Sequence, residues 1–196
     1  MKLLVTLLSL VVAQLILAAE PKTISSSPDS KYAIVVDQDE QLGLVYRLQQ
    51  VQPEQMLLQI KSSYQPNSPT DNSARNDTEA AQVKWSIDSK SVAIDEYNLR
   101  FKGEVFAARI IAGDKAERLI IPVSEVVKTS GERWVRYRLF CDTGWLPDGN
   151  LGLSIIGNAF VDKVSGTEQT EGEIGYDVTL KLVPSLVIIS LRADGE

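Results

Sequence analysis

One short phrase occurs three times in this chain at a nearly constant spacing, and this repetition constrains the fold more than any other feature. The copies read SSPDSK at 26–31, WSIDSK at 85–90 and WLPDGN at 145–150. Their aspartates, Asp29, Asp88 and Asp148, lie 59 and 60 positions apart, and an apolar stretch follows each copy. Self-similarity at a fixed period indicates one structural unit that is used several times. The sequence therefore predicts about three units, near residues 26–80, 81–140 and 141–196.

The residue types in the phrase are those of a tight turn between two strands. Pro presets φ, Asp accepts hydrogen bonds from backbone N–H groups, and Gly or Ser tolerates the chain reversal. Asp29, Asp88 and Asp148 are therefore expected to be structural turn residues. A Trp three positions before the Asp, as at Trp85, is expected to end the incoming strand and to be largely buried.

The rest of the chain also favours β-structure. Apolar residues alternate strictly from Ile174 to Leu182, which is typical of a half-buried strand. We expect a mainly β fold of antiparallel meander sheets, with one short helix that begins at Pro122 and ends before Gly131. Residues 61–80 contain few apolar side chains, so this segment is expected to be a mobile surface loop that separates two units.

The amino terminus has the features of a secretory signal peptide. Lys2 precedes an apolar run from Leu3 to Leu17, and Ala18 and Ala19 offer a small-residue cleavage site. The alternative is a transmembrane anchor, which needs about 20 apolar residues. We expect residues 1–19 to be a signal peptide and residues 20–196 to be a single β-rich domain. That domain would be exported to the periplasm or the extracellular space, without direct membrane insertion after cleavage.

Composition argues against several classes of function. The formal net charge of −6 is unfavourable for binding nucleic acid, whose phosphates attract basic proteins. The chain has no His and one Cys, so Ser-His-Asp triads, Cys-His pairs and His- or thiolate-based zinc sites cannot be assembled. No phosphate-binding glycine loop is present. We therefore expect no cofactor and no enzymatic activity, and Cys141 is expected to be a small buried apolar residue.

A binding or assembly module is the function class that these exclusions favour, with a protein as the expected partner. Trp134, Arg136, Arg138 and Phe140 alternate along one predicted strand and would share one face of it. Arginine beside exposed aromatic rings is enriched at protein interfaces, so these four residues form the candidate interaction patch. The alternative interpretation is a solvated face with aromatic residues at its ends.

Two other functions remain open from the sequence. Glycoside hydrolysis needs only a pair of carboxylic acids, one with a raised pKa, and the nominal candidates are Asp37, Asp39, Glu96 and Asp142. A calcium-binding module would use the acidic turn at 37–40.

The repeated phrase resembles the Trp-Ser-Pro-Asp-Gly-Lys turn of WD40-like and TolB-type β-propeller repeats. In those families, the turn links two strands of a four-stranded blade. The second copy, from Trp85 to Lys90, matches best, the first has Ser26 in place of the Trp, and the apolar register of the third begins one residue early, at Leu151. Propellers close with four to eight blades, so three units imply an open or incomplete propeller-like arrangement. The resemblance implies a binding or scaffold role and carries over no catalytic residue.

Overall fold

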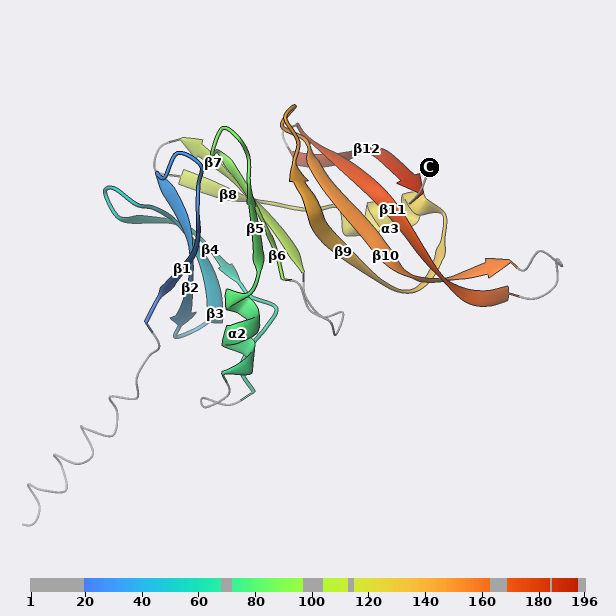
Figure 1. Ribbon diagram of the computed structural model, residues 1–196, viewed down its shortest axis with the longest axis horizontal. Coiled ribbons are helices and arrows are strands. Elements are labelled where there is room, and N and C mark those ends of the chain that lie inside the picture. The colour runs from blue at the N-terminus through green and yellow to red at the C-terminus, as the bar shows by residue number, and fades with distance from the viewer. Residues whose placement is uncertain are drawn as a thin grey trace, which may run out of the picture.

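The computed structural model describes residues 20–67, 72–96, 104–112, 115–162, 169–183 and 185–193. The expected signal peptide, residues 1–19, lies outside these ranges. The described chain is mainly β, as predicted, and its strands form three four-stranded antiparallel sheets placed one beside the next (Figure 1). In each sheet the strands are neighbours in chain order, so each sheet is a simple meander.

The bounds of the twelve strands follow the repeated phrase. Sheet 1 contains β1 (Lys22–Ser26), β2 (Tyr32–Asp39), β3 (Gly43–Gln50) and β4 (Gln55–Lys61). Sheet 2 contains β5 (Gln82–Trp85), β6 (Ser91–Asp95), β7 (Val105–Ala112) and β8 (Lys115–Leu119). Sheet 3 contains β9 (Arg133–Trp145), β10 (Leu151–Asp162), β11 (Gln169–Val183) and β12 (Ser185–Ala193).

Each copy of the phrase joins the first and second strands of its sheet. The strand that enters the turn therefore belongs to the same unit. Sheet 2 begins at Gln82, beside the expected boundary at residue 81, whereas sheets 1 and 3 begin earlier than the expected residues 26 and 141. The clearest consequence is at the third unit, where the expected boundary at residue 140 falls inside β9 rather than between two units.

Two helices connect the sheets in the described chain. α3 (Val123–Ser130) follows Pro122 and ends at Gly131, which adopts a left-handed φ of 75°, so the predicted helix is confirmed. α2 (Ser73–Glu79) lies in the segment expected to be a mobile loop, and that expectation is wrong for these residues. Ala74 and Thr78, one helical turn apart, are both buried there. Neither described helix is long and apolar enough to cross a membrane.

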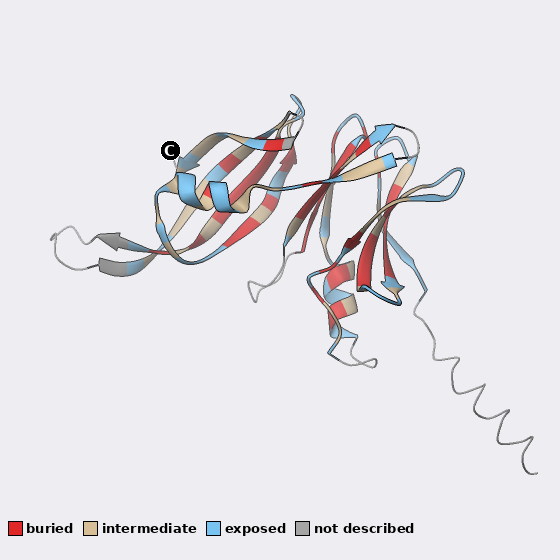
Figure 2. Cartoon of the chain, turned by 180° about the vertical axis from the view of Figure 1, so that it is seen from behind, coloured by how far each residue is buried: buried red, intermediate tan, exposed pale blue. Residues whose placement is uncertain are grey.

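Two hydrophobic clusters hold the sheets together (Figure 2). The first fills the space between sheets 1 and 2, with Ile34 and Tyr46 on one side and Ile94 and Phe106 on the other. The second joins small residues of sheet 2, such as Ala93, to α3 and to one face of sheet 3. Each sheet is thus buried by its neighbour, which explains why sheet 2 has buried residues at consecutive positions of β6.

Candidate functional site

The first repeated turn is built from its own side chains, as the sequence predicts. The N–H of Ser30 donates to the carbonyl of Ser27 at 2.9 Å, which closes a tight turn. Asp29 Oδ1 accepts hydrogen bonds from Ser27 Oγ at 2.8 Å and from the N–H of Lys31 at 3.1 Å. Burial raises the pKa of Asp29, but these hydrogen bonds and the charge of Lys31 together outweigh it and lower the pKa overall. Ser30 has a left-handed φ of 59°, which completes the reversal.

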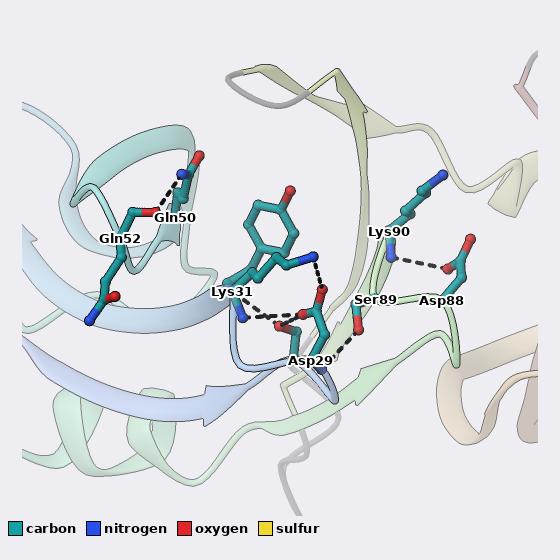
Figure 3. Close-up of polar contacts among 9 residues, drawn as sticks. Asp29, Lys31, Gln50, Gln52, Asp88, Ser89 and Lys90 are labelled. Carbon is teal, nitrogen blue, oxygen red and sulfur yellow. Dashed lines mark hydrogen bonds and ion pairs between the residues drawn. The ribbon is translucent and has the colours of Figure 1, made fainter.

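The second turn repeats this geometry. Asp88 Oδ1 accepts from Ser86 Oγ at 2.6 Å and from the N–H of Lys90 at 3.0 Å, and Ser89 has a φ of 61°. Burial raises the pKa of Asp88, but the bonds from Ser86 and Lys90 outweigh it and lower the pKa overall. Figure 3 shows the first two turns side by side, where the N–H of Asp29 donates to Ser89 Oγ at 3.2 Å.

The third turn is one residue shorter. The N–H of Leu146 donates to the carbonyl of Asn150, four positions ahead, at 2.8 Å. In the second turn, the N–H of Ser86 donates to the carbonyl of Ser91, five positions ahead, at 2.8 Å. Leu146 also lacks the hydroxyl group that supports the other two turns. Asp148 Oδ1 still accepts from the N–H of Asn150 at 3.0 Å, and Gly149 takes the left-handed conformation. The shorter turn is the physical reason why the apolar register begins one residue early at Leu151.

The tryptophans before the turns are not equally buried. Trp85 is partly buried and packs against the first hydrophobic cluster. Its indole Nε1 donates to Ser25 Oγ at 3.1 Å, which ties β5 to β1 across the first two sheets. Trp145, at the corresponding place in the third unit, is 8% exposed and belongs to the second hydrophobic cluster.

The candidate interaction patch does not form a single exposed face. Arg138 is 4% exposed, and its Nη2 donates to Asp95 Oδ1 at 3.2 Å and to the carbonyl of Glu96 at 2.6 Å. The prediction of an exposed Arg138 is therefore wrong. Phe140 is half-buried, with the guanidinium of Arg138 stacked over its ring at 4.6 Å. The sequence could not show that an acidic residue of sheet 2 would face this strand.

A β-bulge separates Trp134 from the other three patch residues. Trp134 pairs with Ala159 and Arg136 with Asn158, so Val135 is an extra residue in β9. The bulge shifts the alternation of side chains between the two faces of β9. Trp134 therefore lies on the same face as Tyr137, with their ring centroids 6.0 Å apart. Trp134 packs against the second hydrophobic cluster, while Arg136 is exposed and donates to Asn158 Oδ1 at 3.2 Å.

The four carboxylates considered for hydrolysis each interact with other groups of the chain. Asp37 is buried and pairs with Arg47, and Asp142 is exposed and accepts from Ser154 Oγ at 3.1 Å. Glu96 is fully buried at 0% exposure and accepts hydrogen bonds from Ser62 Oγ at 2.5 Å and from the hydroxyl of Ser63. Each of these three carboxylates is thus engaged by neighbouring side chains.

The acidic turn at 37–40 is occupied by its own chain. Asp39 Oδ1 accepts from the N–H groups of Gln41 and Leu42, both at 2.9 Å, and Oδ2 accepts from Gln59 Nε2 at 2.8 Å. The bond from Leu42, followed by that from Gln59, lowers the pKa of Asp39. Within the described residues, no group of three or more His, Cys, Asp or Glu side chains is arranged to hold a metal ion.

Cys141 is fully buried, as expected for a structural residue. Burial, followed by the negative charge of Asp95, raises the pKa of its thiol to about 12. Its backbone N–H donates to Asp95 Oδ2 at 2.8 Å, at a place where the pairing of β9 with β10 is irregular. The carboxylate of Asp95 thus satisfies a backbone group that the sheet leaves free, and it holds β9 against β6.

The structure also contains a groove that the sequence analysis did not identify. It has a volume of about 610 Å³ and lies between β7, β8 and the start of α3 on one side and β9 on the other. Its lining is largely apolar: Val105, Leu119, Ile120, Ile121, Val123, Tyr137 and Leu139, with Glu104, Arg118 and Arg138 as the charged members. We call this the β9 groove.

Two residues give the β9 groove an open apolar surface. Ile120 is 77% exposed and Tyr137 is 40% exposed, although both have large apolar side chains. Ile120 follows β8 directly, in the connection to α3. The signal in the sequence is the pair Ile120-Ile121, two large apolar residues between β8 and Pro122. No known protein family, curated protein or solved structure matches this chain.

Proposed function

We propose that this protein is an exported, non-enzymatic binding module and that the β9 groove is its binding surface. The observation that carries the proposal is the groove itself, an open hollow of about 610 Å³ with a mainly apolar lining. Ligand sites in proteins are concave and mostly apolar, with a few polar groups that orient the ligand. Ile120 and Tyr137 both line this hollow and are left in contact with solvent, so they extend its apolar surface outward.

The charged side chains of the β9 groove are two arginines and Glu104, so basic groups outnumber acidic ones and favour a partner segment that is apolar with an acidic neighbour. Arg118 is exposed at the groove and stacks over Phe106, with the guanidinium 5.0 Å from the ring centroid. The positive end of this side chain is thus held in place beside the apolar lining. Arg138 contributes a second guanidinium at the floor, although Asp95 already pairs with it. We propose a protein partner that inserts an apolar side chain and presents a carboxylate to Arg118.

The repeated phrase also suggests an evolutionary relationship to β-propeller repeats. Each sheet is a four-stranded antiparallel meander with the phrase between its first and second strands, which is the arrangement expected for a propeller blade. We infer that the three sheets are divergent repeats of the WD40-like and TolB-type kind, in an open series. Propeller repeats present loops and edges to partners, so this origin supports a binding role.

The proposal that the protein is exported rests on the sequence of residues 1–19. A mass measurement of protein purified from an export-competent host tests it, and we expect a mature chain that begins near Glu20. A chain that retains Met1 in the membrane fraction would support the anchor alternative instead.

Binding in the β9 groove can be tested with a probe of the proposed chemistry. The dye 1-anilinonaphthalene-8-sulfonate is apolar and anionic, so its fluorescence should rise on addition of the protein. Ile120→Asp should abolish most of this rise. Ile87→Asp is the matched control, because Ile87 is 75% exposed in the second turn and outside the groove. Equal fluorescence with both variants would contradict the assignment of the groove as the binding surface.

The natural partner can be sought by photo-crosslinking in the producing cells. A photoreactive amino acid at position 120 should give a discrete protein adduct, whereas the same amino acid at position 87 should not. Charge reversal at Arg118 should reduce the adduct while leaving the fold unchanged. If a purified glycan is hydrolysed by the protein, and a single carboxylate substitution abolishes the reaction, the non-enzymatic assignment is overturned.

A further inference from the structure

One wall of the β9 groove is the outer edge of a strand. β9 pairs with β10 on one side and with none of the described strands on the other, and it is the strand of sheet 3 nearest to sheet 2 (Figure 1). Its part of the groove lining is three consecutive residues, Tyr137, Arg138 and Leu139. Side chains of consecutive residues point to opposite faces of a strand, so the groove runs along the edge of β9 rather than over one face.

The backbone N–H of Leu139 points into the groove. The N–H of Cys141 donates to Asp95 Oδ2 of sheet 2 at 2.8 Å, so it points away from β10. Backbone groups of alternate residues in a strand share one direction, and residues 136–140 pair regularly with β10. The N–H of Leu139, two positions before Cys141, therefore also points away from β10.

The carbonyl of Arg136 gives the same direction for Tyr137. Gly157 of β10 lies opposite Tyr137, and a Cβ added to Gly157 would meet the carbonyl oxygen of Arg136 before any other atom. That carbonyl therefore points toward β10. The C=O and N–H groups of one trans peptide point in opposite directions, so the N–H of Tyr137 points away from β10, along the edge that lines the groove.

The charges of β9 select an acidic partner and disfavour a second copy of this chain. Residues 133–141 of β9 contain three arginines and no acidic residue. Arg118 adds a fourth arginine on the opposite wall, and Glu104 is the acidic member of the described lining. Like charges directly opposite each other destabilise a pair of strands, whereas opposite charges stabilise it. Pairing of β9 with β9 of a second copy would set arginines against arginines.

We propose that the partner of the β9 groove binds as an added strand, through an extended acidic segment of another protein that pairs with the outer edge of β9. Strand addition rests on the proposed function of the groove and specifies the form of the bound partner. Carbonyl groups of the partner accept hydrogen bonds from the N–H groups of Tyr137 and Leu139. Its side chains alternate, with apolar residues beside Tyr137 and Leu139 and acidic residues beside Arg136 and Arg138.

A capped, fluorescently labelled peptide of alternating valine and glutamate is the probe of this pairing. Its fluorescence anisotropy should rise and saturate on addition of the mature chain. Arg136→Glu should weaken binding by roughly tenfold, because it replaces an attraction with a repulsion. Lys181→Glu is the matched control, since Lys181 is an exposed basic residue of β11 outside the groove lining. Equal weakening by both variants would mean that the peptide responds only to the net charge of the protein.

Amide hydrogen exchange, followed by NMR, locates the pairing on the chain. The N–H groups of Tyr137 and Leu139 should exchange more slowly when the peptide is bound, because they become donors to it. The N–H groups of Arg136 and Arg138 point toward β10, so their exchange should change little. Binding of the peptide without slower exchange at Tyr137 and Leu139 would rule out strand addition.

N-methylation of the peptide tests the backbone hydrogen bonds from the partner's side. In an added strand, the N–H groups of the valines and those of the glutamates point to opposite edges, and only one set faces β9. Methylation of that set should abolish binding, and methylation of the other set should preserve it. The set that matters also reports whether the added strand is parallel or antiparallel to β9. If both methylated peptides bound alike, the partner would not be a strand of this sheet.

The dye response of the groove separates this inference from the proposed function. If 1-anilinonaphthalene-8-sulfonate fluorescence depends on Ile120 but the peptide does not bind, the groove is a binding surface and strand addition is wrong. If the peptide binds equally to Ile120→Asp and to the unchanged protein, it binds outside the groove, and strand addition is again wrong. If neither the dye nor the peptide responds to Ile120→Asp, the proposed function fails as well.

Discussion

The backbone N–H of Asp29 donates a hydrogen bond to Ser89 Oγ at 3.2 Å, and this bond joins two copies of the same turn from different sheets. The two residues are 60 positions apart, which is about the length of one repeat of the sequence. Ser89 is 2% exposed and has a left-handed φ of 61°. Its buried hydroxyl group accepts the hydrogen bond from Asp29. Ser30, the corresponding residue of the first turn, has a φ of 59° but is exposed.

This difference predicts opposite responses to glycine. Ser30→Gly should stabilise the protein by about 0.5 kcal/mol, because relief of the left-handed conformation exceeds the added entropy of the unfolded chain. Ser89→Gly relieves the same conformation but removes the acceptor for Asp29, so we expect no gain or a net loss. Denaturant unfolding of both variants measures the contrast. A similar gain at the two positions would show that the bond between the turns contributes nothing.

The aspartates at the turns should matter even though they are exposed. Asp88→Ala removes the acceptor for Ser86 Oγ and for the N–H of Lys90, and we expect it to cost about 1 kcal/mol. Asp39→Ala should also destabilise the protein, because Asp39 accepts three hydrogen bonds in its own turn. Glu40→Ala, an exposed neighbour in that turn, should change stability by less than about 0.5 kcal/mol.

The same carboxylates predict a pH dependence. The pKa values of Asp88 and Asp39 are lowered below their ordinary value of 3.8 in the folded chain. Each therefore contributes stability that is fully present above pH 3.8 and is lost as the pH falls through the lowered folded pKa. The unfolding free energy of Asp88→Asn should decline less over this range than that of the unchanged protein. If the unfolding free energies of Asp88→Asn and of the unchanged protein fell equally with pH, the hydrogen bonds at Asp88 would not contribute to stability.

The buried ion pair between Arg138 and Asp95 makes a prediction about the contact of sheets 2 and 3. Arg138→Met leaves Asp95 buried without its cation and should cost about 3–5 kcal/mol, whereas Arg138→Met combined with Asp95→Asn should cost less than Arg138→Met alone. Arg136→Met, two positions away on the exposed part of β9, should cost less than about 0.5 kcal/mol. Equal effects of Arg136→Met and Arg138→Met would mean that the observed burial of Arg138 does not matter for stability.

Cys141 should be chemically inert in the folded protein. Its side chain is fully buried, and burial raises the pKa of the thiol to about 12, so the reactive thiolate is scarce at neutral pH. A thiol reagent such as 5,5′-dithiobis(2-nitrobenzoic acid) should label the native chain only as fast as it unfolds. Rapid labelling without denaturant would show that β9 separates from sheet 2 in the native state.

Local features of the fold could be predicted from the sequence, because their causes lie within a few residues. The turn at Asp88 follows from side chains adjacent to it, and α3 follows from Pro122 and Gly131 at its two ends. The alternation from Ile174 to Leu182 likewise specified a half-buried strand, which is found as part of β11. In each case the interactions that fix the structure join residues that are close in the sequence.

The features that were missed depend on residues far apart in the chain. Arg138 is buried because Asp95, 43 positions earlier, lies opposite it. Trp134 changes face because the pairing of β9 with β10 contains a bulge that no local pattern reveals. α2 was assigned to a loop because the two residues that it buries are the small Ala74 and the polar Thr78, which hydrogen-bonds to Ser62 and to the carbonyl of Ala74. The β9 groove arises only when the connection after β8 meets a strand of another sheet.

Glu96 provides a test of how the segment between sheets 1 and 2 is held. Its buried carboxylate accepts hydrogen bonds from Ser62 Oγ at 2.5 Å and from the N–H of Ser63 at 3.1 Å, and Ser62 Oγ also lies 3.1 Å from Thr78 Oγ1 of α2. Glu96→Ala leaves these buried donors without their acceptor, so we expect a loss of about 3 kcal/mol. Glu173→Ala, which removes an exposed carboxylate in β11, should have little effect. Limited proteolysis adds a local readout: cleavage within residues 61–80 should accelerate in Glu96→Ala well before sheet 3 is cut. If cleavage instead began in sheet 3, or if both variants were cut at the same rate, the carboxylate would not be what holds α2 against the sheets.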